Sequence, residues 1–330
     1  MLLKDLIYLF IEERAGHYSQ RTLNIYFNNL KEFYAWNKNK QVEEIGQEDI
    51  DKFILRIECR GYRNSTIKGY LHSLKTFFEF CKKYNFKNKF FYNFSRYPLD
   101  PLKINFIYKK DFNKIIDNIF HAERRSELKE APVLLIRDLA IIQILIETGI
   151  AVAEISRLKM EDINLDKKVI FIREKNRPDR HLVISRDTVD LIEKVISFRD
   201  DTKGYLFCRL DRAAYVQNNI TPRSVERLVK GYSNGKFSPK DFRHTFIMLK
   251  LLKKRGVYEV SDLVGGTSDC SKTAYRKEIL KLEKEVKITR KDYNAYEYLK
   301  NRYGKLVLDI LCLGDRQKFS FDREMKLKIL

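Results

Sequence analysis

The sequence predicts a mainly α-helical protein with a small antiparallel sheet (an α+β fold), divided into two domains. Apolar residues recur at the three- and four-residue spacing of amphipathic helices along most of the 330 residues. One segment, near residues 169–185, instead carries two short β-branched runs on either side of a turn. The length and an apolar content of 44% are sufficient for two domains with separate cores.

Four helices are expected in the first 85 residues, at Leu2–Arg14, Ser19–Asn37, Gln47–Arg60 and Asn64–Tyr84. The second and fourth helices share the pattern T-φ-x-x-Y-x-x-x-L-K-x-F, in which φ is apolar, 44 residues apart. This echo indicates two similarly packed helices in one bundle. Its tyrosines, Tyr26 and Tyr70, are therefore expected in the core rather than in a catalytic role.

Prolines mark the expected boundary between the domains. Pro98 and Pro101 lie in a stretch with little periodicity, which indicates a connection rather than a helix. We therefore assign residues 1–97 to an N-terminal helical domain, 98–108 to a linker and 109–330 to a second domain with an extended tail.

The second domain is expected to be mainly helical around one buried helix. Helices are predicted at Lys110–Phe120, Val133–Thr148 and Ala151–Met160, and the run LLIRDLAIIQILIE in the second is apolar enough for a central position. Strands at Val169–Arg173 and His181–Ser185 flank KNRPD and predict a hairpin with a proline-bearing turn. Further helices are expected near Asp187, Pro222, Pro239, Tyr258 and Ser271.

The charge points to a polyanionic partner. The chain has 65 Lys and Arg against 45 Asp and Glu, a net charge of +20. Nine basic residues against one acid lie between positions 60 and 96, interleaved with aromatics: Arg60, Arg63, Lys68, Lys75, Lys82, Lys83, Lys87, Lys89 and Arg96. All but the last are candidate DNA-binding residues in a linker that lies along phosphates. The alternative is a solvated connector.

Composition indicates no metal site, disulfide framework or membrane span. The five cysteines lie far apart without a CxxC pair, which fits a reducing cytosol. The N-terminal MLLKDLIYLFIEERAG is interrupted by charges and predicts a helix rather than a signal peptide. No run approaches the roughly 18 apolar residues of a membrane span.

One helix begins with an unusual concentration of basic groups. In SPKDFRHTF, Lys240, Arg243 and His244 fall within about one turn. These side chains either hold a phosphate or form the solvated basic edge of an ordinary helix.

Four motifs in order carry a family resemblance. The box FRHTF begins at Phe242, and LVGGTSDCSKTAY ends at Tyr275, 32 residues after Arg243. An upstream box, TGIAVAEI, begins at Thr148, and the predicted hairpin carries Lys175. These segments resemble the HxLRHTF-like, LGHxxxxxTxxY-like and TGLRxSEL-like boxes and the lysine-bearing hairpin of the tyrosine recombinase (phage integrase) family.

The resemblance covers nearly everything from Leu2 to about Leu280. The N-terminal bundle resembles the family's core-binding (SAM-like) domain. The resemblance therefore implies that the two domains form a C-shaped clamp around double-stranded DNA.

The resemblance also implies roles for five residues. Tyr275 would attack a DNA phosphodiester, leaving a 3′-phosphotyrosine and a free 5′-hydroxyl, so no cofactor or metal is expected. Arg243 would clamp the phosphate, and His244 would bond the phosphate or brace that arginine. Lys240 stands where histidine is usual and would donate to the phosphate but serve poorly as a base. Lys175 would protonate the leaving oxygen, bind phosphate only, or lie in a solvated turn.

Two positions depart from the family pattern. Gly266 occupies the usual histidine or tryptophan position. Ala151 occupies the position of the first phosphate-clamping arginine, and a donor of this kind is typically worth about 10²- to 10³-fold in rate. Arg157 lies six residues further along and cannot simply replace it. The alanine is either a designed change that inactivates the chain or a natural variant that uses another cation.

The expected function is that of a site-specific recombinase acting as a tetramer on DNA in the cytoplasm. Integration, excision, inversion and dimer resolution all remain open. The segment Lys305–Leu313 either docks on a neighbouring protomer or caps its own domain. The alternatives are a non-catalytic DNA-binding member of the fold, a type IB topoisomerase, or a helical RNA-binding or scaffold protein.

Overall fold

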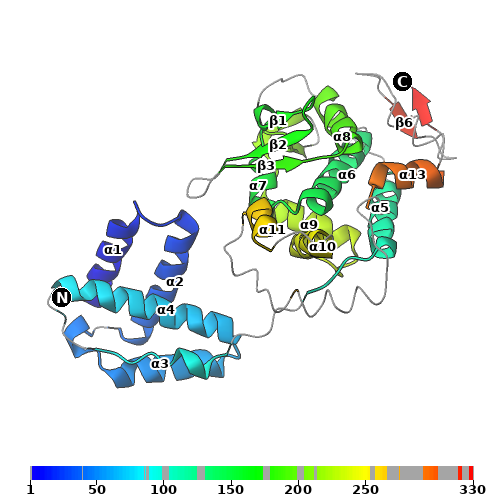
Figure 1. The fold of residues 1–330 in the computed structure, drawn as a ribbon. Coiled ribbons are helices and arrows are strands. Elements are labelled where there is room, and N and C mark those ends of the chain that lie inside the picture. The colour runs from blue at the N-terminus through cyan, green and yellow to red at the C-terminus, as the bar shows by residue number, and fades with distance from the viewer. Residues whose placement is uncertain are drawn as a thin grey trace. The chain divides into compact units, whose positions relative to one another are not determined.

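The computed structural model forms two compact units, Met1–Leu102 and Lys103–Leu330 (Figure 1). It describes residues 2–38, 40–84, 86, 89–98, 104–124, 131–173, 179–198, 204–211, 214–252, 257–265, 275, 293–303, 319–321 and 327–329.

The first unit is a bundle of four helices, α1 (Leu3–Arg14), α2 (Gln20–Trp36), α3 (Gln47–Cys59) and α4 (Asn64–Cys81). Short 3₁₀ turns lie at Val42–Glu44, Lys82–Tyr84 and Phe94–Arg96. The four predicted helices are confirmed, with boundaries that differ by a few residues. The first helix packs on α2 and α4, and α4 also packs on α2 and α3.

Aromatic side chains fill the core of this bundle. Phe10, Phe33, Phe53 and Phe77 are fully buried and meet one another and their neighbours edge to face. The repeat tyrosines Tyr26 and Tyr70 are 5% and 8% exposed, which confirms their predicted core position.

The basic, aromatic stretch after α4 is not a free linker. Phe86 and Tyr97 are buried in the bundle core, and Phe90, Tyr92 and Phe94 pack against it. The interpretation of this stretch as a linker along phosphates is therefore wrong for its aromatic half, because burying these rings outweighs solvating them.

The second unit surrounds one buried helix. Its helices are α5 (Lys109–Arg124), α6 (Ala131–Thr148), α7 (Val152–Ile155), α8 (Arg186–Ser197), α9 (Pro222–Tyr232), α10 (Pro239–Leu252), α11 (Val257–Val264) and α13 (Ala295–Tyr303). Every residue of α6 from Leu139 to Thr148 is buried, and the helix packs on α5, α8 and α10 (Figure 1). The prediction of a central buried helix is confirmed.

The sheets of this unit are small and antiparallel. Strands β1 (Ile163–Asn164), β2 (Val169–Ile172) and β3 (Arg180–Val183) form a three-stranded sheet in that order, with Ile170 opposite Leu182. The predicted hairpin is therefore confirmed. Two further hairpins, β4–β5 (Cys208–Asp211 and Ala214–Asn219) and β6–β7 (Phe319–Phe321 and Leu327–Ile329), were not predicted.

The predicted helix Ala151–Met160 is wrong for most of its length. The helix ends at Ile155, and a 3₁₀ turn follows only at Met160–Asp162. The Leu158 carbonyl accepts from Leu206 N–H at 2.7 Å, and Met160 N–H donates to the Gly204 carbonyl at 2.9 Å. These two backbone groups bond to residues 204–206, so they are not available for the hydrogen bonds that would continue the helix.

The C-terminal helix α13 packs on α5 within the same chain. The Tyr293 hydroxyl donates to the Ile107 carbonyl at 2.7 Å, and the Tyr303 ring stacks on Phe120 with centroids 4.4 Å apart. The predicted docking segment Lys305–Leu313 and the predicted helix near Ser271 lie outside the described residues, apart from Tyr275 itself.

Candidate active site

A short loop between α6 and α7 forms one wall of the candidate site. Gly149 has φ +64°, and a Cβ atom there would lie 2.5 Å from Cδ1 of the Phe246 ring. The loop therefore needs glycine for both its conformation and its close approach to α10. Ala151 follows in extended conformation, and its N–H donates to Glu154 Oε2 at 2.7 Å.

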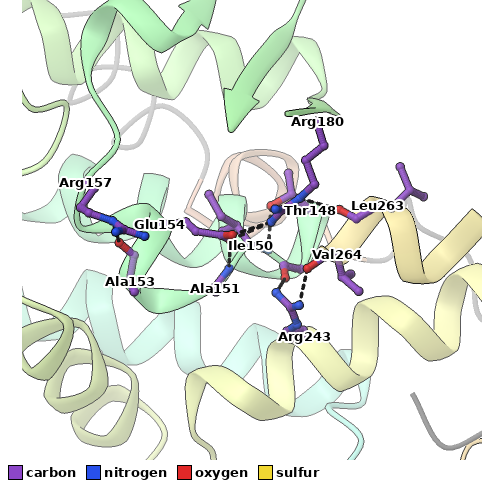
Figure 2. A network of polar contacts seen from close by, with 11 residues as sticks. Thr148, Ile150, Ala151, Ala153, Glu154, Arg157, Arg180, Arg243, Leu263 and Val264 are labelled. Carbon is purple, nitrogen blue, oxygen red and sulfur yellow. Dashed lines mark hydrogen bonds and ion pairs between the residues drawn. The ribbon is translucent and has the colours of Figure 1, made fainter. Parts of the chain in front are cut away.

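Arg243 bridges this loop to the end of α11. One guanidinium nitrogen donates to the Gly149 carbonyl at 3.1 Å, and the other terminal nitrogen donates to the Val264 carbonyl (Figure 2). The side chain is partly exposed and adjoins an open pocket. The planar guanidinium is thus held in place by the backbone on two sides.

Arg180 bridges the same two segments from β3. Its Nη2 lies 2.8 Å from both carboxylate oxygens of Glu154, and its Nε donates to the Leu263 carbonyl at 3.1 Å (Figure 2). The side chain is 8% exposed. This residue is not among the site residues predicted from the sequence. A signal was available, because Arg180 alternates in register with the buried Leu182.

The hydroxyl of Tyr275 is hydrogen bonded to Nδ1 of His244. The tyrosine is 4% and the histidine 7% exposed, and Nε2 of the ring has no hydrogen-bond partner within the described part of the chain. Burial lowers the pKa of the His244 imidazole to about 4, with a further lowering from the positive charges of Lys240 and Arg243 and an opposing effect of Asp241. The imidazole is therefore neutral at neutral pH.

An open pocket of about 600 Å³ adjoins Ala151. Its lining includes four cationic side chains against two carboxylates: Lys230, Lys236, Lys240, Arg243, Glu226 and Asp241. Three of these groups have partners: Arg243 donates to the two backbone carbonyls described above, Lys236 pairs with Asp111 at 2.7 Å, and Asp241 accepts from Ser238. The excess of positive charge suits the pocket to an anionic ligand.

The structure brings part of the predicted site together. Ala151, Arg243 and Lys240 line one pocket, and His244, next to Arg243 on α10, contacts Tyr275. No hydrogen bond between His244 and Arg243 is found among the described residues, so the bracing role stays a prediction. Lys175 and Gly266 lie outside the residues that the structure describes.

The candidate DNA-binding residues of the first unit are mostly exposed. Three of them form ion pairs: Arg60 with Glu32, Lys82 with Glu79 and Lys83 with Glu13. The Lys75 ammonium lies 5.9 Å from the ring centre of Phe94. Arg63, Lys68 and Lys89 have no ion pair within the described residues, and Lys87 lies outside them. Surface ion pairs are weak, so a phosphate can replace the carboxylates.

Among the described residues, no group of three or more His, Cys, Asp or Glu side chains is placed to hold a metal ion. None of the helices in the described ranges is both long enough and apolar enough to cross a membrane.

Comparisons with known proteins agree with these features. The profile of the phage integrase family matches residues 105–288, and that of the phage integrase N-terminal SAM-like domain matches residues 6–85. The tyrosine recombinase XerC of Thermodesulfovibrio yellowstonii is 24% identical, over 76% of this chain and 83% of the relative. Tyrosine recombinase XerA of Pyrococcus horikoshii is 26% identical, over 72% of this chain and 92% of the relative.

A solved structure shows the same fold. The Tn1549 transposon integrase in complex with transposon right end DNA superposes with a TM-score of 0.62 at 16% identity, covering 86% of this chain and 100% of the other. The family profile spans more than half of the chain, and the boxes that begin at Thr148 and Phe242 lie on the elements described above. This chain therefore belongs to the phage integrase family.

Proposed function

We propose that this chain is a site-specific recombinase that cleaves and rejoins DNA strands through a 3′-phosphotyrosine intermediate. The observation that carries this proposal is the position of the Tyr275 hydroxyl against α10, whose neighbouring Arg243 and Lys240 line a cationic pocket. The names of the curated relatives and the DNA complex of the structural relative support it.

In this mechanism the pocket receives the scissile phosphate. Arg243 donates to the non-bridging oxygens, and Lys240 adds positive charge that stabilises the five-coordinate transition state. The phenol oxygen of Tyr275 attacks phosphorus and displaces the 5′-oxygen, which takes a proton from Lys175. The phosphodiester energy is retained in the protein–DNA bond, and the reverse reaction joins the new strands.

Ala151 makes the pocket incomplete. In the family pattern this position supplies the first arginine of the phosphate clamp, whereas here a methyl group lines the pocket. We propose that the chain is a slow enzyme or an inactivated one for this reason. The same observation favours a second candidate function, that of a DNA-binding member of the family that does not cleave.

DNA binding and assembly complete the proposal. The candidate cations of the first unit are proposed to contact phosphates: Arg60, Arg63, Lys68, Lys75, Lys82, Lys83, Lys87 and Lys89. Residues 1–97 and 109–330 are proposed as the two arms of a clamp, with tetramers forming on DNA through the tail. Such a protein would act where DNA lies, in the bacterial or host cytoplasm.

A nicked suicide substrate tests the catalytic claim. Once the strand is cut, the short fragment that carries the free 5′-hydroxyl diffuses away, so the strands cannot rejoin and the covalent adduct accumulates. We expect an adduct with the parent chain or with Ala151→Arg, and none with Tyr275→Phe. Tight binding without any adduct, even in Ala151→Arg, would support the non-cleaving DNA binder. Relaxation of supercoiled DNA by monomers without sequence preference would instead indicate a topoisomerase.

A further inference from the structure

We propose that His244 is the group that accepts the proton of the Tyr275 hydroxyl when that oxygen attacks DNA. This inference rests on the proposed function, because it requires Tyr275 to be the nucleophile. It assigns to a buried residue of α10 a role that the resemblance did not give it.

The contact itself meets the first requirement for a base. A general base must lie within hydrogen-bond reach of the proton that it removes, and Nδ1 of His244 is hydrogen bonded to the Tyr275 oxygen. The ring has no other hydrogen bond among the described residues, since its Nε2 is buried without a partner. Among the described residues, the Tyr275 hydroxyl is therefore the hydrogen-bond partner of the His244 imidazole.

Lys240 cannot perform this task. Its side chain is exposed, and a charged ammonium donates hydrogen bonds but accepts none. The substitution of the usual histidine by lysine therefore keeps positive charge at the pocket but removes a proton acceptor. His244, four residues later and one helical turn away, supplies an imidazole on the buried side of the same helix.

The charge state of the ring fits a base that works only with DNA present. Burial, Lys240 and Arg243 lower the pKa of His244 to about 4, so the ring is neutral and has a lone pair to offer. A phosphate in the adjoining pocket brings negative charge, which favours the imidazolium and raises this pKa. Asp241 already acts in that direction.

The proposed step balances as follows. The O–H bond of Tyr275 breaks and its proton goes to Nδ1 of His244, while the phenol oxygen forms a bond to phosphorus. The bond from phosphorus to the 5′-oxygen breaks, and that oxygen takes a proton from Lys175, as proposed above. On rejoining, the attacking 5′-hydroxyl gives its proton to the neutral amine of Lys175 and forms the bond to phosphorus. The bond from phosphorus to the phenol oxygen breaks, and that oxygen recovers its proton from the imidazolium.

Two DNA substrates that differ in the leaving group distinguish whether His244 acts as a base, as an acid or only in the structure. Single-turnover adduct formation is measured in the parent and in Ala151→Arg with an ordinary strand and with one whose scissile 5′-oxygen is replaced by sulfur. A thiolate leaves without taking up a proton, so the sulfur-containing substrate should restore cleavage by the Lys175→Ala variant. We expect His244→Gln to be slower by about 10²- to 10⁴-fold with both substrates. The exposed His17→Gln is the control, and DNA affinity should be unchanged in both histidine variants.

The outcomes distinguish the two proposals. Two results would overturn the role of His244 as the base but not the proposed function. In the first, His244→Gln forms the adduct as fast as the parent. In the second, the sulfur-containing substrate restores the parent rate in His244→Gln. Faster adduct formation also overturns it, because the contact would then hold Tyr275 back. Absence of adduct from the parent and from Ala151→Arg overturns the proposed function and this role with it.

A measurement without DNA tests the inference independently of turnover. Nitrogen-15 NMR of histidine-labelled protein reports which ring nitrogen carries the proton. We expect Nε2 of His244 to be protonated and Nδ1 to accept from the phenol, with a shift of the Nδ1 resonance in Tyr275→Phe. A proton on Nδ1 would mean that the ring donates to Tyr275, and a donor cannot be the base.

Discussion

The substitution Ala151→Arg is expected to raise the rate of DNA cleavage about 10²-fold. Ala151 has φ −78° and ψ 149°, which any L-residue adopts, and its N–H is bonded to Glu154 whatever its side chain. Its methyl group lines the pocket beside Arg243 and Lys240. A longer side chain therefore enters open space, so no loss of fold stability from steric clash is expected.

The expected size follows from two opposing effects. A preorganised donor to a developing oxyanion typically contributes about 10²- to 10³-fold, or about 2.7–4 kcal/mol of activation free energy. The new guanidinium also repels Arg243 and Lys240 until a phosphate arrives. At an effective dielectric constant of about 20, two unit charges repel by roughly 4 kcal/mol at 4 Å and about half of that at 8 Å. We therefore expect the lower end of the range.

The assay is single-turnover formation of the covalent adduct on a nicked substrate at saturating protein. Ala153→Arg is the matched control, because it adds the same charge at an exposed position outside the pocket. An equal gain in this control would show that net charge and not the clamp limits the rate. No gain in Ala151→Arg, with DNA affinity unchanged, would refute the assignment of this pocket to the scissile phosphate.

Three further predictions concern stability. Gly149→Ala should destabilise the fold by about 2–4 kcal/mol in urea titrations, because it combines a left-handed conformation with a clash against Phe246; Gly231→Ala, with open space around its Cβ position, should be neutral or stabilising, and a similar loss in both would contradict this account. Arg180→Met should cost about 3–5 kcal/mol by leaving the Glu154 carboxylate, whose side chain is only 12% exposed, without its cationic partner. Glu154→Gln should recover part of this loss, and additive losses in the double variant would refute the pairing argument. The pKa of His244 is about 4 in the folded chain and about 6.5 in the unfolded one, so only the unfolded state takes up this proton as pH falls from about 6.5 to 4. Stability should therefore fall across this window by at most roughly 3 kcal/mol more in the parent than in His244→Gln, and parallel pH profiles would refute the assignment.

Local pattern predicted the helices and the hairpin because their signals lie within a few residues. The helices α1 to α4 carry continuous amphipathic spacing, and α6 is predominantly apolar in sequence. The hairpin β2–β3 combines β-branched runs with a proline-bearing turn. Fold class therefore followed from short-range features of the chain.

The missed features depend on contacts between distant segments. The helix after Ala151 stops because Leu158 and Met160 bond to residues 204–206, which no local pattern reports. The strands β4 and β5 read CRLD and AYVQNN and lack clear alternation of apolar residues. The aromatic stretch after α4 has the composition of a linker, yet its rings fill the bundle core.

The candidate site shows the same division. The motifs located Arg243, Lys240, His244 and Tyr275 in the chain, but their geometry was not readable from spacing. The hydrogen bond of Tyr275 to His244 joins residues 31 positions apart. His244 bonds Tyr275 and not the adjacent Arg243 because it lies on the buried side of α10, and the sequence spacing does not reveal which side that is.

The ion pair between Arg180 and Glu154 has a fixed polarity. The carboxylate must stand at position 154, since it also accepts from Ala151 N–H, and the guanidinium must stand at 180, since it also donates to the Leu263 carbonyl. A reciprocal exchange of the two residues would conserve charge and volume but would set a donor against an amide and an acceptor against a carbonyl. Both residues can therefore be replaced together by an uncharged pair, but the arginine and the glutamate cannot exchange positions.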